Sequence, residues 1–328
     1  MSSYPPIIEV AEANQSYRRF PMVAQLGILV VILGVAFLAT WNPVEPDSTP
    51  DQARPTPLAQ SAATTERSPL PAIAADSLAL TARAAYVWDI AGQRALFTKN
   101  HTEVFPLASI TKLMTALLAY ELIDEQSVTT VPLAAIRQPG HSGLAAGEQL
   151  TQEMLMQLAL ITSSNDAAYA LAHAVGERLG PGPAVQQFVT AMNVRADELG
   201  YESLSFFNPT GLDESATQAG GYGTARDVSF LMEYIVQNYP ELLEPTRQEF
   251  TRVYNEAGAH HNALNTNRMV TAIPNIIGSK TGFTDLAGGN LTVVVDVGFN
   301  RPVVITVLGS TRSERFTDVL AIHAALTQ

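Results

Sequence analysis

Residues 106–115 read Pro-Leu-Ala-Ser-Ile-Thr-Lys-Leu-Met-Thr, and this stretch determines how the rest of the chain is interpreted. The apolar residues after Lys112 predict a buried helix over about 109–122. Because Ser109 lies three residues before Lys112, its hydroxyl and the amine share one face of that helix. If the face is dry, burial lowers the pKa of the lysine and lets it act as base to a serine nucleophile. An exposed lysine at a helix start is the alternative interpretation.

A second string, Ser163-Ser164-Asn165, lies between two helical patterns. Serine and asparagine are favoured at helix N-termini, so the string alone predicts a cap. In an acyl-transfer site, Ser163 could relay a proton to the leaving group and Asn165 could bind a substrate amide. The two roles are compatible with each other.

A third string, Lys280-Thr281-Gly282, ends a β-like segment at 275–281. A strand that carries lysine and threonine offers a cation and a hydroxyl to an anionic substrate end. The glycine permits close approach of the backbone. As a nearby cation, Lys280 would also lower the pKa of Lys112.

Hydrophobic patterns place strands at both ends of the region 79–328 and helices between them. The expected strands cover 84–89, 93–98, 249–255, 275–281, 289–298 and 302–309. The expected helices cover about 109–122, 151–161, 165–178, 183–199, 224–238 and 313–326. This order predicts one α+β domain whose sheet is built from the two ends of the chain.

Composition narrows the classes of function. The chain has 328 residues and a formal net charge of −12, from 31 acidic and 19 basic side chains. This balance argues against a nucleic-acid binder, whose surface must offset phosphate charge. The chain has no cysteine, which excludes disulfides and thiolate metal sites, and its six histidines are scattered. We therefore expect neither a metal nor another cofactor.

The N-terminal part predicts a membrane anchor and a tether. The nearly uninterrupted apolar run at 22–41 is just long enough to span a bilayer as a helix. Arg18 and Arg19 precede it, so we expect residues 1–21 in the cytoplasm. A cleaved signal peptide and a buried helix are the alternatives. Residues 42–78 are rich in Pro, Ala, Ser and Thr, which predicts a flexible linker that reaches on the order of 35 Å on average.

Longer strings connect the motifs to a known family. They are 106–115, Phe207-Asn208-Pro209-Thr210-Gly211-Leu212, Thr224-Ala225-Arg226-Asp227 and Gly278-Ser279-Lys280-Thr281-Gly282-Phe283-Thr284. Over roughly residues 80–325 the chain resembles the low-molecular-mass penicillin-binding proteins, specifically the serine D-Ala-D-Ala carboxypeptidases of bacterial cell walls. The resemblance implies a penicillin-recognising, transpeptidase-like fold: a central antiparallel sheet flanked by helices, with an all-helical lobe.

The resemblance also implies a role for each site residue. Ser109 is the expected nucleophile, Lys112 its base and Ser163 a proton relay. The expected substrate-binding residues are Asn165, Lys280, Thr281, Gly282, Phe283 and, as a second contact to the substrate carboxylate, Arg315. The backbone N–H groups of Ser109 and Phe283 would form the oxyanion hole. Ser164 stands where many relatives have glycine, and we expect little effect because that side chain normally points away.

The implied activity is removal of the terminal D-Ala from peptidoglycan stem peptides through an acyl-enzyme, with β-lactams as covalent inhibitors. The expected location is the bacterial cell membrane, with the catalytic domain, 79–328, in the periplasm. The chain ends soon after its third string, where many relatives continue into a β-rich domain. Shorter relatives include D,D-endopeptidases that cut cross-links, so that activity is the alternative. A β-lactamase, suggested by Glu241 and Glu244, and a non-catalytic β-lactam sensor are further alternatives.

Overall fold

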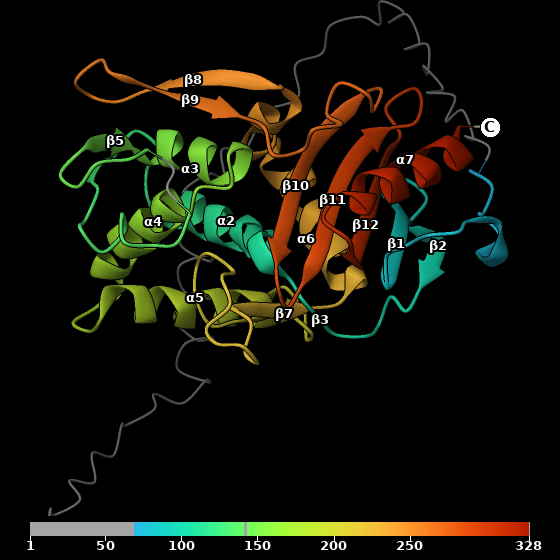
Figure 1. The fold of residues 1–328 in the computed structure, drawn as a ribbon, viewed down its shortest axis with the longest axis horizontal. Helices are drawn as coiled ribbons and strands as arrows, with labels where there is room; N and C mark the ends of the chain where they lie inside the picture. Colours follow the sequence, from blue (N-terminus) through green and yellow to red (C-terminus); the bar gives the residue numbers. More distant parts are fainter. Residues whose placement is uncertain (1–68, 141–142, 328) are drawn as a thin grey trace, which may run out of the picture. The chain divides into compact units, whose positions relative to one another are not determined.

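The sheet that carries the candidate site is built from both ends of the described chain (Figure 1). A computed structural model describes residues 69–140 and 143–327. The strand order is β10-β11-β12-β1-β2, and every neighbouring pair is antiparallel. The strands are β1 (Ala84–Asp89), β2 (Arg94–Lys99), β10 (Ile276–Thr284), β11 (Gly288–Asp296) and β12 (Pro302–Ser310). The predicted α+β domain, with a sheet made from two chain ends, is confirmed.

Helices cover both faces of this sheet. In Figure 1, α6 (Ala225–Asn238) lies behind the strands and α7 (Glu314–Leu326) in front. Side chains alternate between the faces of a strand. Val294 of β11 therefore packs in the core that includes α6, whereas Val293 and Val295 pack in the core that includes α7. Burial on both faces is the reason that β11 and β12 read as continuous runs of β-branched residues.

Four helices form a lobe beside the edge strand β10 (Figure 1). They are α2 (Lys112–Leu122), α3 (Gln152–Ile161), α4 (Asn165–Leu179) and α5 (Ala184–Glu198). Every side chain of α2 from Lys112 to Ala119 is buried. Gly176 allows α5 to begin against α4, because a Cβ there would lie 1.9 Å from the carbonyl oxygen of Ala184.

Short elements complete the described fold, and the patterns above did not predict most of them. The short strands are β3 (Phe105–Pro106), β4 (Val128–Thr130), β5 (Gln149–Thr151), β6 (Ser205–Phe206), β7 (Gly221–Gly223), β8 (Phe250–Tyr254) and β9 (His260–Leu264). The 3-10 helices are η1 (Ala75–Ser77), η2 (Ala108–Thr111), η3 (Pro240–Leu242) and η4 (Glu244–Arg247). The helix expected from 109 thus begins with the 3-10 turn η2.

The end of the segment expected as linker lies on the domain. The Ile73 N–H donates to the carbonyl oxygen of Leu96 at 2.8 Å, and the Leu70 and Leu78 side chains pack against the apolar cluster beneath α7. Residues 1–21, the expected anchor at 22–41 and most of the expected linker lie outside the described residues. Within the part of the chain that the structure describes, none of the helices combines the length and apolar character needed to cross a bilayer.

Candidate active site

Three segments that are distant in sequence bring five of the expected site residues together. Lys112, the first residue of α2, has its Nζ 2.8 Å from Ser109 Oγ and 2.7 Å from Asn165 Oδ1. Lys280 of β10 donates from Nζ to Ser163 Oγ at 2.9 Å. The helix start, the loop before α4 and the sheet edge therefore meet in one hydrogen-bonded site.

Ser109 lies on a strained turn that the sheet holds in place. Ala108, just before it, has a φ of +49°, in the left-handed region that a residue with a Cβ rarely adopts. Asn290 of β11 is fully buried and donates from Nδ2 to the carbonyl oxygens of Pro106 and Leu107, at 2.9 and 3.0 Å. Sequence reasoning missed Asn290, because nothing in its local string distinguishes it from a polar residue at a strand start.

Gly282 allows β10 to lie against this turn. A Cβ at this position would be 2.8 Å from the carbonyl oxygen of Leu107 and 3.2 Å from the Ile110 nitrogen. Any larger residue would push the strand away from η2. The two N–H groups expected as oxyanion hole, those of Ser109 and Phe283, belong to these two adjoining backbone segments.

The amine of Lys112 is fully buried among three oxygen atoms. It donates to the carbonyl oxygen of Thr210 at 2.7 Å and to Asn165 Oδ1 at 2.7 Å, and Ser109 Oγ is the third neighbour. The orientation of the Asn165 amide follows from its Nδ2, which donates to the carbonyl oxygen of Pro139. Burial lowers the pKa of Lys112 from 10.5 to about 7.

This geometry determines which of the two groups, the lysine amine or the serine hydroxyl, donates the hydrogen bond between them. A neutral amine has two N–H groups and one lone pair. The oxygens of Thr210 and Asn165 can only accept, so they take the two N–H groups. The lone pair is left for Ser109, the one neighbour that can donate. The neutral Lys112 is therefore arranged as a base toward the serine hydroxyl.

The Thr210 carbonyl is presented by a turn whose string was noted only for its resemblance. Asn208 Oδ1 accepts from the N–H groups of Thr210 and Gly211, at 3.1 and 2.7 Å. Gly211 has a φ of +76°, and a Cβ there would lie 1.9 Å from the Ala108 carbonyl oxygen. The Asn-Pro-Thr-Gly signal of a turn was visible in the sequence, but its position against Lys112 depends on tertiary structure.

Lys280 is a second buried amine with fewer partners. Its Nζ donates to Ser163 Oγ and to the carbonyl oxygen of Thr281, both at 2.9 Å. Burial lowers its pKa well below the usual value, and the cations Lys112 and Arg315 lower it further.

The Ser-Ser-Asn string is both a cap and part of the site, with the roles divided between residues. Ser164 is the N-cap of α4, and its Oγ accepts from the Ala167 N–H at 2.9 Å. Ser163, with a φ of +60°, and Asn165 contact the two lysines. The middle side chain therefore points into the helix start and away from the amines.

The side chains of Thr281 and Arg315 have partners outside the lysine centre, by which we mean Ser109, Lys112, Ser163, Asn165 and Lys280. Thr281 Oγ1 is 2.6 Å from Thr266 Oγ1. Arg315 is 7% exposed and donates from Nη1 to the carbonyl oxygen of Gly282. Burial lowers its pKa to about 10, and Arg312 and Arg268 contribute to the decrease. The expected carboxylate contact is thus beside the Lys-Thr-Gly strand, in a cluster of cations.

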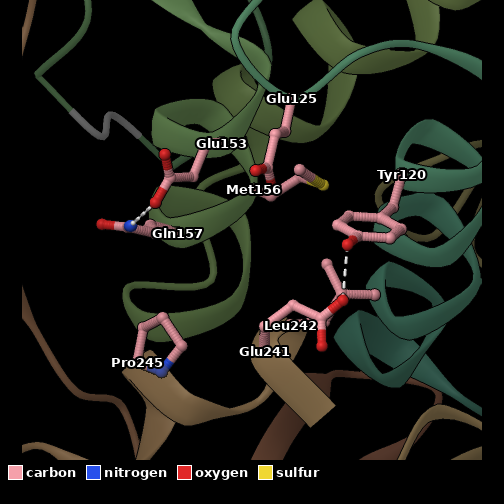
Figure 2. Close-up of a pocket in the computed structure, with 8 residues that line it drawn as sticks. All are labelled: Tyr120, Glu125, Glu153, Met156, Gln157, Glu241, Leu242 and Pro245. Carbon is pink, nitrogen blue, oxygen red and sulfur yellow. Dashed lines mark hydrogen bonds between the residues drawn. The ribbon is translucent and has the colours of Figure 1, made fainter. Parts of the chain in front are cut away.

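Glu241, considered above as a deacylating residue, lies elsewhere. Figure 2 shows it in a pocket on the helical lobe, where its carboxylate accepts a hydrogen bond from the Tyr120 hydroxyl. None of the expected site residues lines this pocket. Glu244 starts η4 and lines a separate hollow.

Comparisons with known proteins match this chain over its described domain. A family model for D-alanyl-D-alanine carboxypeptidase matches residues 71–312. The D-alanyl-D-alanine carboxypeptidase DacF of Bacillus subtilis is 31% identical over 232 residues, which are 69% of this chain and 57% of DacF. The D-alanyl-D-alanine endopeptidase of Escherichia coli is 30% identical over 230 residues, 68% of this chain and 70% of that protein.

A solved structure agrees with the fold. Penicillin-binding protein D2 from Listeria monocytogenes, in its ampicillin-bound form, superposes with a TM-score of 0.64 at 27% identity. The superposition covers 76% of this chain and 99% of that one. The resemblance and the penicillin-recognising fold inferred from the strings are therefore confirmed.

Proposed function

Because the chain belongs to the D-alanyl-D-alanine carboxypeptidase family, we propose that it is a serine D,D-carboxypeptidase that removes the terminal D-Ala from peptidoglycan stem peptides. The observation that carries the proposal is the buried amine of Lys112. Its two N–H groups are taken by Asn165 and Thr210, and its lone pair faces the Ser109 hydroxyl. The arrangement has the nucleophile, base and low pKa that acyl transfer requires.

Acylation begins at Ser109. Its hydroxyl proton moves to Lys112 Nζ while Oγ attacks the carbonyl carbon of the penultimate D-Ala. Negative charge then develops on the carbonyl oxygen, which accepts from the backbone N–H groups of Ser109 and Phe283. Losing one such donor costs about 3–4 kcal/mol of barrier in comparable sites.

Departure of the terminal D-Ala requires a proton on its nitrogen. Ser163 donates it as the C–N bond breaks, and the proton that Lys112 took from Ser109 replaces it on Ser163 Oγ, so that Lys112 becomes neutral again. Lys280, whose Nζ donates to Ser163 Oγ at 2.9 Å, holds this hydroxyl in place. The carboxylate of the leaving D-Ala interacts with the Thr281 hydroxyl and the Arg315 guanidinium. In the second half of the reaction, neutral Lys112 takes a proton from a water that attacks the ester carbonyl carbon. That proton passes to Ser109 Oγ as the acyl C–O bond breaks, which restores the free hydroxyl.

Covalent labelling tests this assignment. Fluorescent penicillin should form a stable adduct with the full chain, and Ser109→Ala should abolish it. Ser77→Ala removes an exposed serine hydroxyl that is not part of the site, so this variant serves as the matched control. Mass spectrometry of a peptide ending in D-Ala-D-Ala should show loss of one D-Ala. Labelling that persists in Ser109→Ala would reject the nucleophile.

Cleavage of cross-links is the alternative activity. It is supported by the similarity to the E. coli endopeptidase. Isolated peptidoglycan digested by the protein distinguishes the two: loss of terminal D-Ala indicates a carboxypeptidase, and loss of cross-linked dimers indicates an endopeptidase.

We also propose that residues 22–41 anchor the protein in the cytoplasmic membrane, with the catalytic domain on the periplasmic side. The support is the length of the apolar run and the arginines that precede it. Because the chain lacks cysteine, single cysteines can be introduced without background. A cysteine in residues 42–65 should react with a membrane-impermeant maleimide in cells with a permeabilised outer membrane, and one in residues 1–15 should not.

A further inference from the structure

A cavity of about 680 Å³ borders the strand that carries the Lys-Thr-Gly string. Its walls come from two segments, residues between 264 and 269, which lead from β9 toward β10, and residues 312–317 at the start of α7. None of the lysine-centre residues lines this cavity. Of the expected substrate-binding residues, Arg315 alone is among its lining residues.

Three consecutive residues of β10 contact this cavity's walls. Thr281 Oγ1 is hydrogen-bonded to Thr266 Oγ1, and the Gly282 carbonyl oxygen accepts from Arg315. The next residue, Phe283, has the Arg312 guanidinium 5.1 Å from its ring centre. The cavity therefore lies next to the place where the proposed function puts the leaving D-Ala.

The cavity carries unbalanced positive charge. Its walls include three arginines, Arg268, Arg312 and Arg315, and none of them forms an ion pair within residues 69–140 and 143–327. Arg315, more than nine-tenths buried, also has no hydrogen-bond acceptor for its Nε in the described structure. Glu314 is the one acid on the walls, and its Oε2 accepts from the Thr317 hydroxyl.

Arg315 is buried, so its charge is costly unless an anion joins it, whereas Arg268 and Arg312 are exposed at the cavity and accessible to an anion. One leaving-group carboxylate, beside Thr281 and Arg315, would leave Arg268 and Arg312 unmatched. The cavity also has room for more than a single D-alanine, and apolar walls from Met269 and Phe316 that suit an aliphatic chain. Its charge and size thus fit a longer leaving group with a second carboxylate.

We propose that this cavity is a leaving-group subsite in which Arg268 and Arg312 bind a second carboxylate of the departing amine. The inference rests on the proposed function. A leaving D-Ala has one carboxylate, whereas the amine released from a cross-link belongs to a second stem peptide and has several. The subsite therefore allows the enzyme to accept the anionic leaving strand of a cross-linked peptide in addition to a leaving D-Ala.

Paired synthetic substrates test the subsite directly. Each is an acylated D-Ala joined to a leaving D-amino acid, either D-aspartate, D-glutamate or D-2-aminoadipate, and each is compared with its own side-chain amide. For at least one chain length, kcat/KM should favour the carboxylate by about tenfold, which corresponds to about 1.4 kcal/mol. Each ratio cancels effects common to both members of a pair.

Substitutions locate the preference. The double change Arg268→Gln and Arg312→Gln should bring the ratio near unity, whereas Arg268→Lys with Arg312→Lys should keep most of it. Arg178→Gln removes an exposed arginine at the end of α4 and should leave the ratio unchanged.

Two different results would overturn the inference. If D-Ala is released normally but no pair shows a preference above about twofold, the subsite is rejected and the proposed function stands. If no substrate is cleaved and penicillin does not label Ser109, the proposed function fails and the subsite fails with it.

Discussion

The lysine centre and the cavity lined by Arg268, Arg312 and Arg315 (the arginine cavity) both adjoin strand β10, but their positive charges have opposite surroundings. Around Lys112, protein oxygens take every hydrogen of the amine, and burial brings its pKa to about 7. Arg268 and Arg312 form no ion pair within the described structure. The difference separates two tasks: a base must be neutral and held by the protein itself, whereas a binding cation must remain charged and available to the substrate.

The largest effect is expected when lysine and arginine are exchanged in each region. Lys112→Arg keeps the charge but removes the base, because a guanidinium does not deprotonate at working pH. We expect penicillin acylation to slow by about 10²- to 10⁴-fold, measured by stopped-flow or gel labelling. In the cavity, arginine-to-lysine changes should have a small effect. An active Lys112→Arg variant would show that neutrality of this amine is not required.

The hydrogen bonds of Asn290 go to the turn before Ser109 and to Gly309, and none goes to a residue that lines the cavity, so removing Asn290 should separate the two regions. Asn290→Ala leaves the carbonyl oxygens of Pro106 and Leu107 without their donor, and the Gly309 N–H without its acceptor. We expect a loss of about 3 kcal/mol in the free energy of unfolding, measured by urea denaturation, since each unsatisfied buried group costs about 1–3 kcal/mol. Acylation should slow as the Ser109 turn relaxes. A decrease in the free energy of unfolding below about 1 kcal/mol would mean that the Ser109 turn is stable without the hydrogen bonds of Asn290.

The two regions should also respond differently to pH. The acylation rate should rise about tenfold per pH unit up to about 7 and then level off, because the neutral fraction of Lys112 controls it. The carboxylate preference of the cavity should stay flat between pH 6 and 9, because guanidinium groups remain charged in this range and even the buried Arg315 has a pKa of about 10. A rate that rises only near pH 10 would indicate an ordinary, hydrated lysine.

The low pKa of Lys112 has a consequence for stability with a definite sign. Between about pH 7 and 10.5 the unfolded chain binds a proton at this residue and the folded chain does not. The free energy of unfolding should therefore increase with pH across this window, and the full cost of the buried charge is present below it. Lys112→Met should flatten the increase between pH 7 and 9 in thermal unfolding.

The smallest expected effect belongs to the cap beside the lysine centre. Ser164→Ala removes the acceptor for the Ala167 N–H and should cost about 1 kcal/mol of stability. Ser164→Gly should reduce the free energy of unfolding by only about a few tenths of a kcal/mol, because glycine is tolerated at an N-cap. Acylation should change little in both variants, and a large loss of rate in Ser164→Gly would assign the middle residue a role beyond capping.

The sequence predicted the long elements, and the grouping of the lysine-centre residues in space, for identifiable reasons. Helices with strong apolar periodicity and a clear cap, such as 225–238 after Thr224, differ from expectation by a single residue. Ser109, Lys112 and Lys280 could be assigned because their spacing is encoded in short strings. Strands of two or three residues, such as β6, carry too few residues to show a period.

The remaining features depend on contacts between distant segments. Arg268 and Arg312 look like ordinary surface arginines in the sequence, and only the fold places both beside Arg315. Asn290 and the Thr210 carbonyl likewise acquire their roles through partners far along the chain. Local sequence patterns predict the secondary structure of a segment, but they do not show which charged side chains lack an ion-pair partner in the fold.

The joining of the sheet from both ends of the chain has a consequence for how the protein is made. β1 pairs with β12, with Ala84 opposite Leu308, so the central strands cannot associate until synthesis is nearly finished. The helices between them depend mainly on one another and can collapse earlier. Since Gly282 and Asn290 lie on the late strands, the Ser109 turn becomes reactive only in a completed molecule. An incomplete chain therefore has the nucleophile but not the means to use it.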